Sequence, residues 1–90
     1  MNKIRRKRIG ILSASIQDIY SRLQSELDEL ESLMMEEEDA QESIPESLQT
    51  EENERYATSC QAIEAMEEAF DKIDSAIEYL QHAREHLKGI

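Results

Sequence analysis

Five basic residues, Lys3, Arg5, Arg6, Lys7 and Arg8, are crowded into the start of this chain of 90 residues. Arginine forms paired hydrogen bonds with phosphate oxygens, so Arg5, Arg6 and Arg8 are the first candidates for a phosphate site. The simpler interpretation is a solubilising terminus whose charges pair with acidic neighbours in an assembled bundle. The sequence leaves both interpretations open.

Two Arg–Tyr pairs offer another way to hold a nucleotide. Arg22 lies two residues after Tyr20, and Arg55 directly precedes Tyr56. An arginine can bind a phosphate while a nearby tyrosine ring stacks on a base or ribose. Both tyrosines also fall on apolar stripes, so a place at the edge of the core is the competing prediction for them.

The other groups that could support chemistry are weaker candidates. His82 and His86 have the i, i+4 spacing of a zinc site, but the sequence offers no third ligand. Glu-x-x-Glu pairs hold magnesium in all-α nucleotide pyrophosphatases, yet a chain with 21 acidic residues produces such pairs readily. Cys60 has no histidine near it in the sequence to activate its thiol. We therefore predict no metal, no cofactor and no enzymatic activity.

The charge changes sharply along the chain. Residues 1–17 carry five basic groups and no acid, whereas residues 18–54 carry fourteen acids and a single basic residue, Arg22. The formal net charge of -11 disfavours general binding to nucleic acid. A single cysteine and the lack of an apolar run of about 18 residues indicate a cytoplasmic protein without a membrane span.

Long amphipathic helices must position these residues. The chain has two glycines, one proline and apolar residues that recur every seventh position, which is a helical pattern. We predict one domain, residues 1–90, with helices over about 3–39 and 54–88. The connection, about 40–53, includes a short helical turn at 45–49 with Ser43 as its cap, followed by a second cap at Thr50 or Asn53. A short connection between two long helices predicts an antiparallel hairpin.

Each predicted helix carries a broad apolar stripe. The predicted core or oligomer contacts are Ile9, Leu12, Ile16, Ile19, Leu23, Leu27 and Leu30 in the first helix, and Ile63, Met66, Phe70, Ile73, Ile77 and Leu80 in the second. Beside the second stripe runs the series Ala62, Ala69, Ala76 and Ala83, whose small side chains let another helix approach closely. A lone hairpin buries only one stripe of each helix. We therefore predict an all-α hairpin that forms homo-oligomers, as a four-helix or larger bundle.

Three short segments resemble a known group of proteins. The connection Ile44-Pro45-Glu46-Ser47-Leu48-Gln49, the pair Glu54-Arg55 and the segment Ala65-Met66-Glu67-Glu68-Ala69 resemble small helical proteins encoded by phages and prophages of Firmicutes. The resemblance implies an accessory protein of a mobile element in a bacterial host. Where such chains often have glycine after the arginine, this one has Tyr56.

Two kinds of function fit these features. In the first, a non-enzymatic oligomer sequesters a nucleotide-type immune signal, such as a cyclic dinucleotide or an ADP-ribose derivative, as an anti-defence protein. The ligand would lie where hairpins meet or at the basic terminus, with arginines on phosphate and tyrosines on the base. In the second, the chain is a protein-interaction module or inhibitor that acts through its acidic surface or apolar stripe.

Overall fold

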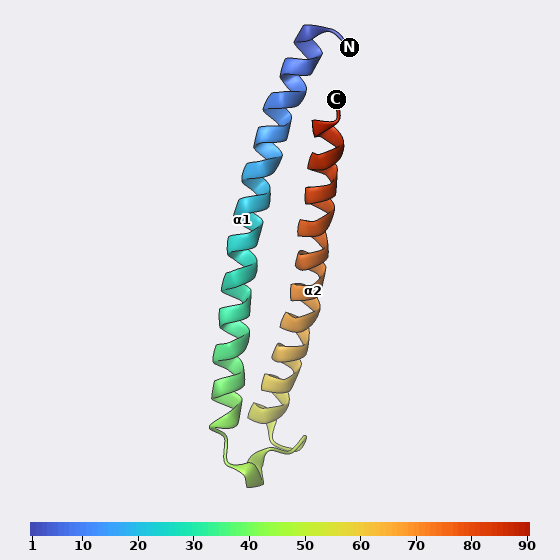
Figure 1. The fold of residues 1–90 in the computed structure, drawn as a ribbon. Helices are drawn as coiled ribbons and strands as arrows, with labels where there is room; N and C mark the ends of the chain where they lie inside the picture. Colours follow the sequence, from blue (N-terminus) through green and yellow to red (C-terminus); the bar gives the residue numbers. More distant parts are fainter.

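Two long helices form an antiparallel hairpin in the computed structural model, which describes residues 1–90 (Figure 1). Helix α1 spans Lys3–Glu42, one turn of 3-10 helix, η1, spans Glu46–Leu48, and helix α2 spans Glu54–Lys88. The molecule measures 69 × 16 × 15 Å. The all-α hairpin that the sequence predicts is confirmed. Neither helix contains the long uninterrupted apolar stretch that a membrane-spanning helix requires.

Side-chain caps set the ends of the helices. Asn2 Oδ1 accepts a hydrogen bond of 2.8 Å from the Arg5 backbone at the start of α1. Asn53, one of the two predicted caps of the second helix, accepts one of 3.0 Å from the Tyr56 backbone. These bonds satisfy backbone N–H groups that have no partner within the helix.

The end of α1 differs from the prediction. The helix continues to Glu42 before Ser43 closes it, where the Ser43 hydroxyl donates a hydrogen bond of 2.8 Å to the Ala40 carbonyl. The predicted cap of Ser43 on the following turn is therefore wrong. Pro45 precedes η1 without any side-chain cap, because the Ser43 hydroxyl is already turned back toward α1.

The seam between the helices holds the apolar side chains of the hairpin. In α2 the six predicted contacts, Ile63, Met66, Phe70, Ile73, Ile77 and Leu80, are all half-buried or buried. In α1 the half-buried apolar residues are Ile9, Ile16, Tyr20, Leu23, Leu27, Leu30 and Met34. Two seven-residue series of α1 thus face α2: Ile9, Ile16, Leu23 and Leu30, and Tyr20, Leu27 and Met34.

Leu12 and Ile19, also predicted as contacts, lie outside this seam. Their side chains are 53% and 50% exposed, and Leu33 of the same series is 45% exposed. A helix packed on one neighbour buries a single stripe, so α1 with three apolar series must leave one in solvent. Within one hairpin Leu12 and Ile19 are therefore not core residues.

Helix α1 extends beyond α2 at the open end of the hairpin. Figure 1 shows the first turns of α1 standing past the C-terminal end of α2. Every residue from 1 to 8 is exposed. We call residues 1–12 the overhang, and it carries all five basic residues of the N-terminal cluster.

Candidate anion-binding site

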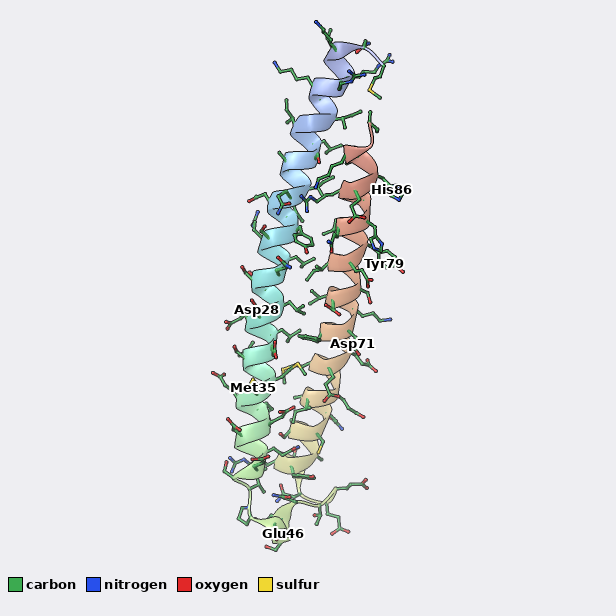
Figure 2. The ribbon with its side chains drawn as sticks, viewed as in Figure 1. Asp28, Met35, Glu46, Asp71, Tyr79 and His86 are labelled. Atoms are coloured by element: carbon green, nitrogen blue, oxygen red, sulfur yellow. The ribbon has the colours of Figure 1, made fainter.

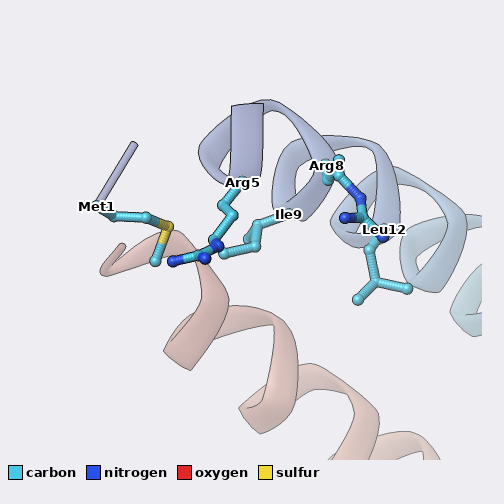
Figure 3. A pocket seen from close by; sticks show the side chains of 5 residues that line it. All are labelled: Met1, Arg5, Arg8, Ile9 and Leu12. Atoms are coloured by element: carbon cyan, nitrogen blue, oxygen red, sulfur yellow. The ribbon is translucent and has the colours of Figure 1, made fainter. Parts of the chain in front are cut away.

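The overhang brings Arg5 and Arg8 into one surface pocket. The pocket has a volume of about 320 Å³ and is lined by Met1, Arg5, Arg8, Ile9 and Leu12 (Figure 3). Residues three and four apart are neighbours on a helix, which is why these side chains gather on one side of α1. Two guanidinium groups beside three apolar side chains suit a ligand that has both an anionic group and a flat apolar part.

Arg6, predicted together with Arg5 and Arg8, does not line this pocket. Each step along a helix turns the side chain by about 100°, so Arg6 and Lys7 project from other sides of α1. The basic cluster is continuous in sequence but divided in space. Arg6 and Lys7 therefore provide a matched internal control for Arg5 and Arg8.

Tyr20 and Arg22 do not form the predicted ligand pair. The half-buried Tyr20 ring lies against Arg84 of α2, with the guanidinium carbon 5.6 Å from the ring centroid. Gln24 donates a hydrogen bond of 3.2 Å to the Tyr20 hydroxyl. Arg22 instead lines a separate pocket of about 300 Å³ with Ile19 and other neighbours on α1.

Arg84 is a seam residue whose contact with Tyr20 the sequence did not predict. It is half-buried in the seam, and its Nε is buried without a hydrogen-bond partner. A signal was present in the sequence, because Arg84 continues the seven-residue series of Ile63, Phe70 and Ile77 as its one charged member. A buried donor without a partner is destabilising, so Arg84 is a weak point near the open end.

Arg55 and Tyr56 lie at the closed end of the hairpin. Arg55 lines a pocket of about 140 Å³ together with Ala40, Ser59 and other residues of both helices. Tyr56 is half-buried, and a side-chain hydrogen bond to Cys60 raises the pKa of its phenol. Cys60 in turn accepts a hydrogen bond of 3.1 Å from the Gln41 amide. In a molecule 69 Å long these groups are far from Arg5 and Arg8.

His82 and His86 belong to no group of three possible metal ligands. Nowhere in the structure do three His, Cys, Asp or Glu side chains gather as they would around a metal ion. Figure 2 shows His86 and Tyr79 pointing away from α1. Both side chains thus belong to the outer surface of α2.

The chain matches no protein family, no curated protein and no solved structure. Its function therefore has to follow from its own residues. The predicted ligand residues fall into three places along one hairpin: Arg5, Arg6 and Arg8 at the open end, Tyr20 and Arg22 on the body of α1, and Arg55 and Tyr56 at the closed end. Only the overhang pocket combines two cationic groups with an apolar lining.

Proposed function

We propose that this protein is a non-enzymatic binding protein that acts as a homo-oligomer and holds an anionic, nucleotide-type ligand at the overhang. The observation that carries the proposal is that Arg5 and Arg8 line one pocket together with three apolar side chains. The guanidinium groups bind phosphate oxygens, and Met1, Ile9 and Leu12 contact the base or ribose.

The pocket is open to solvent, and for this reason we propose that the protein acts as an oligomer. Met1 is 62% exposed and Leu12 53%, so one hairpin leaves a bound nucleotide largely in solvent. Small-molecule sites that bind tightly cover most of the ligand surface. A second copy that covers the pocket supplies this enclosure.

The resemblance to phage and prophage proteins suggests the biological form of this activity. A small, abundant protein of a mobile element that binds a cyclic dinucleotide or an ADP-ribose derivative lowers the free concentration of a host immune signal. Such sequestration needs affinity and no chemistry. We propose this anti-defence role for the chain, in the cytoplasm of a bacterial host.

Calorimetry with a panel of cyclic dinucleotides, ADP-ribose, ATP and inorganic phosphate tests the proposal. Hydrogen bonds to charged groups contribute about 1.5–3 kcal/mol each when sheltered and less in solvent, so we expect R5A/R8A to weaken binding about 10- to 100-fold. The matched variant R6A/K7A removes the same charge outside the pocket and is expected to change affinity less than about threefold. Equal losses in both variants, or no binding of any nucleotide at millimolar concentration, refute the pocket.

The second candidate is a protein-interaction module or inhibitor acting through the acidic surface. It is favoured by the closed end, where residues 36–54 carry nine acids and no basic residue. Such a surface attracts a basic partner protein. Photo-crosslinking inside host cells from position 38, compared with position 14 on the body of α1, tests this role. A single protein attached specifically from position 38 supports it, and identical adducts from both positions refute it.

A further inference from the structure

One side of the hairpin is largely apolar, with Glu26 as its one charged member, and has no partner. It consists of the series Leu12, Ile19, Glu26, Leu33 and Ala40 in α1 and the series Ala62, Ala69, Ala76, Ala83 and Ile90 in α2. A rotation of 180° about an axis perpendicular to the plane of the two helices exchanges the helices of an antiparallel pair. Residues at the same angular offset from the seam therefore lie on the same side of the hairpin in both helices. The closed-end pocket demonstrates this, because Ala40 and Arg55, seven residues before Ala62, line it together. We call this side the apolar face.

The two sides of the hairpin differ strongly. On the apolar face Leu12, Ile19, Leu33 and Ile90 are between 45% and 53% exposed. Apart from Gly10 and Cys60, the corresponding positions on the opposite side are polar: Gln17, Gln24, Glu31 and Glu38 in α1, and Glu67, Asp74, Gln81 and Lys88 in α2. Burial is therefore favourable on one side only.

Large and small residues alternate across the apolar face. Gln41 contacts Cys60 and Tyr20 contacts Arg84. These two contacts fix which residues of α1 and α2 lie at the same height along the hairpin. Counting from these pairs brings Ile19 level with Ala83, and Leu33 level with Ala69. At these two levels a large side chain of α1 thus lies beside a small one of α2.

We propose that a second copy of this chain covers the apolar face with both open ends at the same end, so that α1 of each copy lies on α2 of the other. The inference rests on the proposed function, which requires an oligomer, and states how its site is completed. In this arrangement Ile19 and Leu33 pack against alanines of the second copy, which gives the alternation of large and small that close packing needs. The reversed arrangement places α1 on α1 and brings Glu26 against its own copy.

The rim of the apolar face is complementary in charge in this orientation. Arg22 and Glu29 border the face on α1, and Lys72 and Tyr79 border it on α2. With open ends together, Glu29 comes within a turn of Lys72 of the second copy, and Arg22 within a turn of Tyr79, whose ring is 73% exposed. Symmetry forms each ion pair and each cation–π contact twice.

The surface area also fits a second copy. The chain exposes 7144 Å², whereas a compact monomer of 10.4 kDa exposes about 5,400 Å². The apolar face runs for about 42 Å from Leu12 to Ala40 at 1.5 Å per residue, and the hairpin is 16 Å wide. Two copies therefore bury roughly 1,300 Å² in total, which is within the range of specific stable interfaces.

This dimer completes the anion site. Arg5 precedes Leu12 by seven residues and Arg8 precedes Arg22 by two such repeats, so both arginines lie on the side that the second copy occupies. Each copy contributes one Arg5 and one Arg8 to a single end of the bundle. The four guanidinium groups repel one another until an anion or added salt screens them.

Analytical ultracentrifugation of the full chain at low and high salt, with and without tripolyphosphate, tests the proposal. We expect a dimer whose dissociation constant falls several-fold with added salt or millimolar tripolyphosphate. I19E/L33E is expected to give a monomer with unchanged helical circular dichroism, whereas Q24E/Q81E on the opposite side remains dimeric. A monomer at all concentrations, or a dimer weakened by salt, overturns the inference.

A distance measurement checks the orientation independently of these variants. Spin labels at S47C in a C60S background mark the closed end, away from the apolar face. Open ends together place the two labels within about 35 Å, whereas the reversed dimer separates them by roughly 60 Å, given a rise of 1.5 Å per residue. A monomer that still binds nucleotide refutes the dimer, and with it the oligomer in the proposed function, but leaves the overhang pocket as the binding site. A dimer with short label distances that binds no nucleotide refutes the proposed function alone.

Discussion

Replacing Arg84 by leucine is expected to stabilise the hairpin. Arg84 is half-buried in the seam, its Nε has no hydrogen-bond partner, and its guanidinium group lies 5.6 Å from the centroid of the Tyr20 ring. Leucine removes the unsatisfied donor and continues the apolar series of Ile63, Phe70 and Ile77. The change is a direct test of whether the seam or a function selects arginine at this position.

The size of the effect follows from three contributions. An unsatisfied buried donor costs about 1–3 kcal/mol, which R84L recovers. The lost cation–π contact costs about 0.5–2 kcal/mol, and a half-buried leucine contributes about 1 kcal/mol of apolar burial. The free energy of unfolding is therefore expected to rise by about 2 kcal/mol, which corresponds to an increase in Tm of about 8–16 °C for a domain of this size.

Thermal and urea unfolding followed by circular dichroism measure this change, at one fixed protein concentration because association also stabilises the fold. R84K serves as the control, since it keeps the charge but loses the planar group over the Tyr20 ring, and it is expected to lower stability by about 0.5–1 kcal/mol. A double-mutant cycle with Y20L isolates the Tyr20–Arg84 term. If R84L lowers Tm, the reasoning fails, and the guanidinium group makes a favourable contact in the native assembly.

Three further changes test single features of the hairpin. N53A removes the cap of α2 and is expected to cost about 1 kcal/mol in urea unfolding, while N53D keeps the acceptor and should stay within about 0.5 kcal/mol of the parent. G10A is expected to stabilise the overhang by about 0.5–1 kcal/mol, because an added Cβ meets no atom within 4 Å; slower amide hydrogen exchange at residues 8–14 measures this, and unchanged exchange contradicts it. S59A deletes a hydroxyl that is buried without a partner in a residue only 5% exposed, so it should leave Tm unchanged or raise it, and a drop of several degrees would reveal a hidden partner of the hydroxyl.

The face of α2 that packs against α1 was predictable, because the apolar residues of α2 lie on one face of the helix. The series of Ile63 and the series of Met66 form one stripe, and the residues beside that stripe are alanines or polar. The first helix was harder, since three apolar series lie side by side on α1. Periodicity does not say which two of them face α2, and only the packed hairpin places Leu12 and Ile19 in solvent.

The candidate site was predictable only in part. Arg5 and Arg8 share a pocket because residues three apart are neighbours on a helix, and this follows from spacing alone. The contact of Tyr20 with Arg84 joins residues far apart in the sequence and depends on the register of the hairpin. Ser43 was misassigned because a serine between two helical segments can cap either of them, and here its hydroxyl bonds to the preceding helix.

The proposed anion site at the overhang lies far from most of the charge that gives the chain its net value of -11. The acidic stretch that begins at Glu36 lies about 42 Å from Arg8 along α1, at 1.5 Å per residue. That distance is about four Debye lengths at 0.1 M salt, so the acids of the closed end barely reduce the positive potential at the overhang. A reversed dimer removes this separation, because it carries the closed end of one copy to the open end of the other and neutralises the arginines. The proposed anion site is therefore compatible with a dimer that has its open ends together and not with the reversed one, and the spin-label distances distinguish these two arrangements.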